Sequence, residues 1–226
     1  MGGWRDTLDA QAACALQRVP RNFYRRRAVD LAPHLLGLIL VHDTPEGVTA
    51  GRMIEVEAYE GPEDRACHAF GGRRTPRTEV MFGPPAFAYV YFTYGMHWMF
   101  NVVSAPEEVP HAVLVRSIEP VCGTDLMAKR RSGMLPLAEG PARMARAMGI
   151  TGRENGMDLV ASDLYIAFPP PGMDSPVEYL VTKRIGVEQS GKAKDYPWRF
   201  VRKGSPPAAI TSATREKDPA RAKARG

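Results

Sequence analysis

Cysteine is scarce in this chain of 226 residues, and no run of apolar residues is long. The three cysteines, Cys14, Cys67 and Cys122, are widely spaced and form no Cys-x-x-Cys pair, so neither a disulfide scaffold nor a cysteine-based zinc site is supported. The longest apolar run, residues 35–41, is far too short to span a bilayer. No apolar core of a secretory signal is visible near the N-terminus. We therefore expect a cytoplasmic protein with no membrane partner.

Metal-binding patterns are also missing from the sequence. The five histidines show neither the His-Glu-x-x-His spacing nor the His-x3-His spacing of zinc sites. Cys67 precedes His68, but a catalytic Cys–His pair needs no adjacency in sequence, so we interpret Cys67 as a buried thiol. We expect no metal and no cofactor.

The composition is that of an ordinary soluble globular protein, with 44% hydrophobic and 24% charged residues. No strong linker interrupts the interior, so we expect one folded domain at residues 18–210, preceded by an N-terminal extension at residues 1–17. Residues 211–226 are basic and lack a hydrophobic period, which predicts a disordered tail. The net charge of +5 favours a polyanionic partner.

The order of periodic segments predicts an α+β fold, because strand-like runs follow one another with short turns between them. We expect a single domain with a curved, mostly antiparallel or mixed β-sheet, flanking helices and a protruding β-hairpin. Helices are expected at residues 30–36, 122–131 and 141–148, the first with Asp30 as its N-cap. Strands are expected at residues 38–42, 49–59, 88–92, 98–104, 111–117, 164–168, 180–187 and 198–202. The long connection at residues 60–86 indicates a functional loop.

The most informative stretch is residues 53–68, MIEVEAYEGPEDRACH. Its side chains alternate between the two faces of a strand as far as residue 59. One face takes Ile54, Val56 and Ala58, and the other takes Glu55, Glu57 and Tyr59. A turn at Gly61-Pro62 then lets the chain double back toward His68. This pattern indicates the edge of a site, although a strand glutamate such as Glu57 is commonly just solvated or salt-bridged.

A second stretch, residues 88–101, predicts a hairpin with an apolar tip. Tyr89 and Tyr91 share one face of its first strand, and Tyr94 and Met96 fall at the bend. Exposed apolar groups at such a tip can wedge between base pairs in the minor groove of DNA. The alternative is that Tyr94 packs beneath a neighbouring loop.

Together these segments resemble the alkyladenine (3-methyladenine) DNA glycosylase family, the mammalian-type monofunctional enzymes of base-excision repair. The resemblance covers residues 18–206. It rests on the segments EVEAYEGPEDRACH, GGRRTPR followed by MF, YVYFTYGM with Asn101 behind it, VLVRSIEP, EGPARMARAMGI, RIGV and RFVRKGSP. It implies a monomer that flips alkylated or deaminated purines out of double-stranded DNA, hydrolyses the N-glycosidic bond and leaves an abasic site.

The resemblance also implies roles for individual residues. Glu57 matches the glutamate that activates the hydrolytic water, Arg116 an arginine that helps to hold this water, and Ile185 a residue whose carbonyl does the same. The residues that match those around the flipped base are Tyr59, His68, Tyr91 and Asn101, the last of which crowds the amino group of normal guanine.

The remaining matches concern the DNA itself. Tyr94 matches the tyrosine that fills the gap left by the flipped nucleotide, and Met96 is its neighbour on the tip. In the basic loop that follows His68, we expect DNA contacts from Arg73, Thr75 and Arg77.

Two other functions fit some of the same residues. A sugar glycosidase could pair Glu55 with Glu57, because residues two apart on a strand lie about 6.5–7 Å apart. The basic loop, the aromatic tip and the lack of a tryptophan-rich groove argue against it. A non-catalytic nucleic-acid module could use the same aromatic and basic side chains to bind a strand, with Glu57 structural.

Overall fold

A 14-residue strand, β2 (Gly47–Glu60), organises the fold of this computed structural model, which describes residues 6–173 and 176–205. One edge of β2 pairs with β5 (His111–Cys122) along most of its length. The other edge pairs first with β1 (Ile39–Thr44) and then, around Val56, with β8 (Arg199–Arg202). Two distant parts of the sequence therefore meet on the same edge of one strand.

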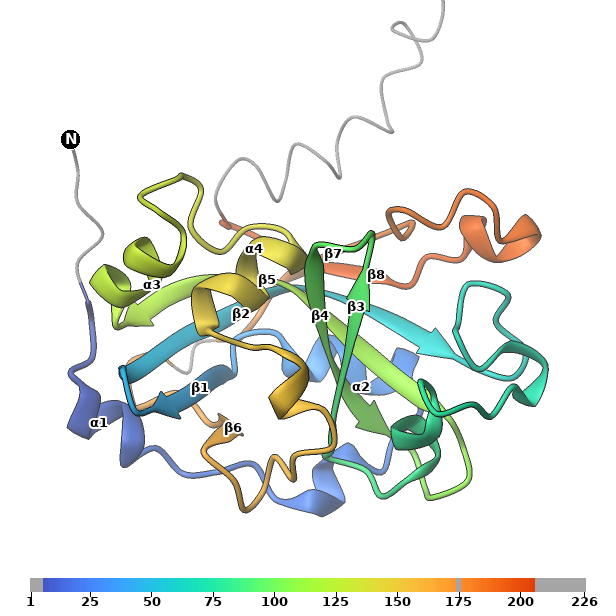
Figure 1. The fold of residues 1–226 in the computed structure, drawn as a ribbon, viewed down its shortest axis with the longest axis horizontal. Coiled ribbons are helices and arrows are strands. Elements are labelled where there is room, and N and C mark those ends of the chain that lie inside the picture. Colours follow the sequence, from blue (N-terminus) through green and yellow to red (C-terminus); the bar gives the residue numbers. More distant parts are fainter. Residues whose placement is uncertain (1–5, 174–175, 206–226) are drawn as a thin grey trace, which may run out of the picture.

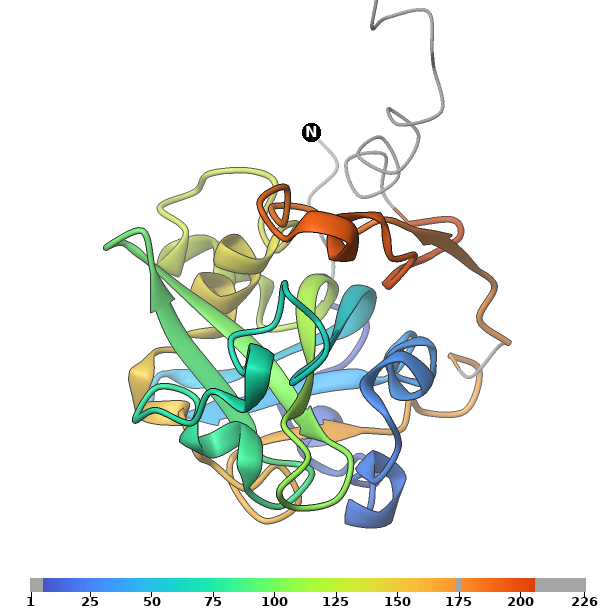
Figure 2. The same cartoon turned by 90° about the vertical axis from the view of Figure 1, so that its right-hand side faces the viewer.

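The other strands extend this sheet on both sides. They are β3 (Ala88–Thr93), β4 (His97–Ser104), β6 (Leu164–Ala167) and β7 (Tyr179–Thr182). The order is β3-β4-β5-β2-β1-β6, β7 pairs with β8, and every pair in the sheet is antiparallel (Figure 1). The prediction of an α+β domain with a mostly antiparallel sheet is confirmed. The β3–β4 hairpin projects from the body of the domain (Figure 2).

The α-helices are short and flank the sheet. They are α1 (Ala10–Cys14), α2 (Ala28–Leu35), α3 (Thr124–Arg130) and α4 (Pro141–Met148). Helix α4 has its predicted bounds, because Pro141 starts it and Gly149 ends it in the left-handed conformation with φ of 71°. Single-turn 3₁₀ helices lie at Arg21–Tyr24, Phe70–Gly72, Glu79–Phe82, Gly152–Glu154 and Gly191–Asp195.

Four predicted elements are wrong in part. Helix α2 begins earlier than expected, so Arg27 is its N-cap and Asp30 lies within its first turn. Strand β5 continues to Cys122, and α3 starts only after Gly123. The left-handed conformation of Gly123, with φ of 72°, ends the strand and turns the chain into the helix. Strand β7 ends at Thr182 rather than residue 187, because the following segment leaves the sheet to contact Asp64 and Glu57.

The central strands separate the hydrophobic core from the opposite face of the sheet. Residues that are paired across antiparallel strands lie on the same side of the sheet. On one side, the central strands contribute Val56, Val115, Phe100 and Val90 to the main core. Helices α2 and α4 add apolar side chains to this core, namely Leu31, Leu35, Met144 and Met148. The predicted alternation holds from Val56 onward. Register irregularities between Met53 and Val56 place Met53, rather than Ile54, in that core.

The opposite face carries a row of candidate site residues. Glu57 on β2 is paired with Leu114 on β5, Leu114 with Asn101 on β4, and Asn101 with Tyr89 on β3. The loop at residues 60–86 covers one end of this face. It packs Cys67, Ala69, Met81 and Phe82 against Tyr89, Val103 and Ala112. The chain thus brings His68 beside the row.

The ends of the chain are described in part. From the predicted extension at residues 1–17, Asp6 accepts hydrogen bonds of 3.1 Å from the N–H groups of Gly123 and Thr124. The predicted tail at residues 211–226 lies outside the described residues. Within the described ranges, no helix is long and apolar enough to cross a membrane.

Candidate active site

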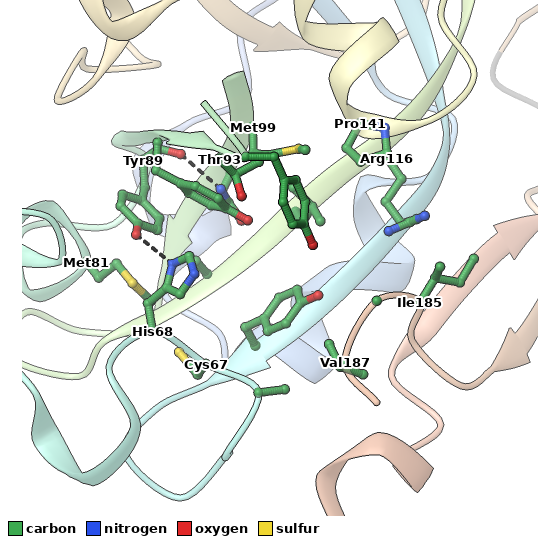
Figure 3. Close-up of a pocket in the computed structure, with 18 residues that line it drawn as sticks. Cys67, His68, Met81, Tyr89, Thr93, Met99, Arg116, Pro141, Ile185 and Val187 are labelled. Carbon is green, nitrogen blue, oxygen red and sulfur yellow. Dashed lines mark hydrogen bonds between the residues drawn. The ribbon is translucent and has the colours of Figure 1, made fainter. Parts of the chain in front are cut away.

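A pocket of about 260 Å³ lies on the functional face of the sheet, between the loop at residues 60–86 and the segment at residues 183–187 (Figure 3). Its walls include seven of the residues singled out from the sequence: Tyr59, His68, Tyr91, Tyr94, Asn101, Arg116 and Ile185. In Figure 3, His68 and Tyr89 lie at one end of the pocket and Arg116 and Ile185 at the other. A pocket of this size suits a single ring system better than a chain of sugars.

Glu57 lies beneath this pocket and is completely buried. Its Oε1 accepts a hydrogen bond of 2.9 Å from the backbone N–H of Ile185 and lies 3.2 Å from Nη1 of Arg116. Its Oε2 accepts a 2.8 Å hydrogen bond from the hydroxyl of Tyr59. A carboxylate oxygen can accept two hydrogen bonds, so Oε2 keeps one acceptor site for a further donor such as water.

Arg116 connects this carboxylate with a second one. Its Nε donates to Oε1 of Glu55 at 2.8 Å, and Nε of Arg199 reaches the same oxygen at 2.7 Å. Burial alone would lower the pKa of Arg116, but the charges of Glu57 and Glu55 raise it above its ordinary value. Burial likewise favours the neutral form of Glu55, yet Arg116 and Arg199 outweigh it and lower the pKa of Glu55.

Glu55 is a structural partner of the arginines. Its Oε2 accepts a 2.6 Å hydrogen bond from the hydroxyl of Ser117, so both of its oxygens are occupied. Glu55 does not line the pocket. A sugar glycosidase with Glu55 and Glu57 as two free carboxylates is therefore not the arrangement found in this fold.

The other end of the pocket is aromatic. Nδ1 of His68 lies 2.8 Å from the hydroxyl of Tyr89, and the His68 ring meets the ring of Tyr91 edge-on with centroids 4.5 Å apart. Arg77 lies over the ring of Tyr91, with its guanidinium carbon 4.8 Å from the ring centroid. Burial, with a smaller contribution from the Arg77 charge, lowers the pKa of His68 to about 4. His68 is therefore a neutral imidazole near pH 7, and its other ring nitrogen, Nε2, lies 3.4 Å from Nη2 of Arg77.

Asn101 is held in place within the pocket wall. Its Nδ2 donates a 3.1 Å hydrogen bond to the backbone carbonyl of Tyr89 on the neighbouring strand. The side chain is buried among β-strands, so it forms a fixed part of the wall.

The sequence interpretation missed several wall residues. They are Met81, Met99, Leu114, Pro141 and Val187. The period of two could have identified Met99 and Leu114, since each lies two residues from an identified site residue on the same strand. No such signal exists for Pro141 and Val187, which come from a helix start and an irregular segment.

The hairpin tip carries an exposed tyrosine. Tyr94 is 81% exposed, and it forms with Gly95 a tight turn in which both residues have positive φ, 50° and 66°. The alternative in which Tyr94 packs beneath a loop is wrong. Met96 is also exposed, but it lines a different hollow on the other side of the tip.

The basic loop divides into different local roles. Arg73 is exposed, and Arg77 lies at the pocket rim over Tyr91. Thr75 accepts and donates hydrogen bonds with Thr78, which shapes the turn between them. Among the residues described, no group of three or more His, Cys, Asp or Glu side chains could hold a metal ion.

A buried ion pair holds together the two segments that form the pocket mouth. Arg184 binds Asp64 with two hydrogen bonds, of 2.5 and 2.8 Å, and neither side chain is accessible to solvent. The guanidinium carbon of Arg184 also lies 4.6 Å from the centroid of Tyr59. Arg184 immediately precedes Ile185, so this pair fixes the backbone N–H that contacts Glu57.

Similarity to known proteins identifies the family of this chain. The family model described as methylpurine-DNA glycosylase matches residues 22–206. A protein of Desulfitobacterium hafniense is 43% identical over 195 residues, which is 82% of this chain and 95% of that protein. Proteins of Clostridium acetobutylicum (43% identical, 82% of this chain, 94% of that protein) and Bacillus licheniformis (44%, 84% and 96%) are similar. All three carry the name "Putative 3-methyladenine DNA glycosylase". The resemblance noted in the sequence is thus confirmed, and the chain belongs to the methylpurine-DNA glycosylase family.

Proposed function

We propose that this DNA-repair glycosylase removes methylated purines such as 3-methyladenine from duplex DNA, with a water activated by Glu57. The observation that carries the proposal is a fully buried carboxylate beneath an aromatic pocket, held by Arg116 and the Ile185 N–H. A base within a duplex cannot enter such a pocket, so the nucleotide must be flipped out of the stack.

The pocket walls support a preference for damaged purines. A purine alkylated at N3 or N7 carries positive charge, and an aromatic face attracts a cation by about 0.5–2 kcal/mol. Arg184 and Arg77 already lie over one face of Tyr59 and Tyr91 respectively, so the purine would use the other face of each ring. Asn101, fixed to the Tyr89 carbonyl, matches in sequence the asparagine that crowds the amino group of normal guanine. Neutral lesions such as hypoxanthine lack this charge, and neutral His68 is placed to hydrogen-bond their ring edge.

The hydrolytic step uses the free acceptor site of Glu57. A water bound to Oε2 transfers a proton to the carboxylate while its oxygen forms a bond to C1′ of the sugar. The electron pair of the broken C1′–N bond leaves with the purine. The carboxylate also faces the positive charge that develops on the sugar, which lowers the barrier.

The decisive experiment measures free base released from alkylated duplex DNA by the purified protein. Oligonucleotides with 3-methyladenine, 7-methylguanine, ethenoadenine or hypoxanthine would rank the substrates. Release of 3-methyladenine is expected. Binding of damaged duplex without release of any base would instead favour the non-catalytic nucleic-acid module.

The product is expected to be an intact abasic site. A glycosylase that also cleaves the strand needs an amine that forms a Schiff base with the sugar, and the described pocket wall contains no lysine. Treatment with borohydride during the reaction should therefore trap no covalent protein–DNA adduct. A trapped adduct would contradict the water mechanism.

Tyr94→Ser should weaken the complex in which the nucleotide is flipped. Tyr94 is proposed to fill the vacated stack, and stacking of an aromatic side chain on a base contributes about 1–3 kcal/mol. Affinity for abasic duplex should fall about tenfold, while the fold is retained because the side chain is exposed.

The control for Tyr94→Ser is DNA in which the lesion is already unpaired, where base release should suffer less. Equal losses on paired, unpaired and undamaged DNA would place the wedge elsewhere.

We further propose that the protein acts as a monomer in the cytoplasm, close to the nucleoid, with residues 18–210 as its catalytic domain.

A further inference from the structure

A second hollow, of about 630 Å³, lies on the other side of the β3–β4 hairpin from the base pocket. Met96, His97 and Trp98 line it from the hairpin, and Arg131, Arg143 and Arg146 line it from the ends and surface of α3 and α4. Figure 1 shows α4 beside the hairpin and α3 on the far side of α4. We call this hollow the arginine pocket.

The arginine pocket and the base pocket are neighbours along the same elements. Tyr94 lines the base pocket and Met96 the arginine pocket, two residues apart at the hairpin tip. Likewise, Pro141 lines the base pocket and the adjacent Ala142 on α4 lines the arginine pocket. A duplex that receives Tyr94 must therefore pass close to both.

Arg130 shows what a structurally paired arginine looks like here. It lies 2.9 Å from the carboxylate of Glu46 and donates to Thr44 and to the carbonyl of Ala147. Glu46 is the one carboxylate among the described residues that line the arginine pocket. Arg130 thus forms the ion pair that joins α3 to the β1–β2 turn.

Arg131 has no such partner. It is 8% exposed, its Nε is buried without a hydrogen bond, and within the described part of the chain no carboxylate lies at ion-pair distance from it. Arg143 and Arg146 lie three residues apart on α4, on the same side of the helix. Among the described residues neither has a carboxylate at ion-pair distance, and the charge of Arg143 acts on Glu139 only from farther away. Each uses one nitrogen on a backbone carbonyl, of Glu139 and Arg130 respectively.

This arrangement is unfavourable without an anion. Burial lowers the pKa of Arg131, and the charges of Arg143 and Arg146 lower it further. A buried charge without a counter-ion is costly, and two like charges beside it add to that cost. A bound anion with several oxygens would satisfy all three guanidinium groups, which form paired hydrogen bonds with phosphate.

We propose that Arg131, Arg143 and Arg146 bind a backbone phosphate of the duplex on the Met96 side of the hairpin. The proposal rests on the proposed function, because the duplex is the polyanion and Tyr94 sets where it lies. The site binds the DNA on the side of the tip opposite the base pocket, so the duplex stays bound while the nucleotide is flipped out of the stack.

The test compares Arg131→Gln with wild type on undamaged duplex, by fluorescence anisotropy over a range of KCl concentrations. Affinity should fall about tenfold, since a charge-assisted contact is lost. The slope of log K against log[KCl] should shrink by about 0.9, the value for one phosphate. The thermal midpoint of Arg131→Gln should equal or exceed that of wild type, because no internal ion pair is removed. Arg143→Gln should shift the slope in the same direction.

Two controls make the result specific. Arg25→Gln removes an equal charge at the exposed C-cap of Arg21–Tyr24 and should leave the slope unchanged. Arg130→Gln should lower the thermal midpoint, because it loses Glu46. An unchanged slope in Arg131→Gln, or an equal change in Arg25→Gln, would overturn the phosphate site.

Single methylphosphonate linkages, which remove the charge of one phosphate, identify the contacted strand. One position in either the lesion strand or its complement should weaken wild type about tenfold and leave Arg131→Gln unaffected. Equal weakening of both proteins at every position would also overturn the proposal. Binding to undamaged duplex requires no hydrolysis, so a protein with the expected salt slopes but no base release would contradict the proposed function and leave the phosphate site standing.

Discussion

Glu57→Gln is expected to lower the single-turnover rate of base release by about 10²–10⁴-fold, the usual contribution of a general base. The amide still accepts hydrogen bonds from Tyr59 or Ile185, but it cannot take a proton from water or stabilise positive charge on the sugar. Affinity for lesion-containing duplex should stay close to that of wild type, because the substitution keeps the size of the side chain and leaves the residues that line the pocket unchanged. The measurement is quenched-flow release of base with enzyme in excess, together with binding.

The matched control for this variant is Glu119→Gln, a half-buried carboxylate on the neighbouring strand outside the pocket. It should release base at the wild-type rate. Glu55→Gln is not a neutral control, because Glu55 binds Arg116, Arg199 and Ser117 and its loss should lower the stability of the fold. Retention of more than about a tenth of the wild-type rate by a folded Glu57→Gln protein, a barrier change below about 1.4 kcal/mol, would show that another group activates the water.

Asp64→Ala is expected to reduce the free energy of unfolding by about 3–5 kcal/mol, the usual result of removing one partner from a buried ion pair. Both oxygens of Asp64 bind Arg184, whose guanidinium has no access to solvent and would remain charged without a counter-ion. Chemical denaturation measures the loss. Base release should fall as well, because Arg184 precedes Ile185, the residue whose N–H contacts Glu57.

An exposed ion pair on the same segment provides the control for Asp64→Ala. Lys183 binds Asp195 at 2.6 Å with both side chains about half exposed, so Asp195→Ala should change stability little. The double variant Asp64→Ala/Arg184→Met should recover much of the loss, because the unpaired charge is gone. If Asp64→Ala is as stable as Asp195→Ala, the buried pair does not hold the pocket mouth together.

Much of the catalytic half of the site could be predicted from sequence because it lies on regular strands. A period of two fixes which residues share a face, so Glu57 and Tyr59 were correctly placed together, as were Tyr89 and Tyr91. The predicted bend at Tyr94 was also correct. The next residue, Gly95, has the positive φ that glycine adopts readily in tight turns. Those features depend only on neighbours within a few residues.

The sequence by itself therefore determined the α+β class, the alternation of β2 from Val56 onward and the bounds of α4. It also singled out Glu57, the carboxylate that we propose activates the water. Only the tertiary structure decided that Ile185 presents its N–H to Glu57, that Arg184 pairs with Asp64 and that Arg131 is left without a partner. It also decided that Glu55 serves the arginines. These contacts join residues that are mostly separated by more than 60 positions, through loops without any period. Strand pairing and the burial of charge select them, and both depend on the whole folded chain.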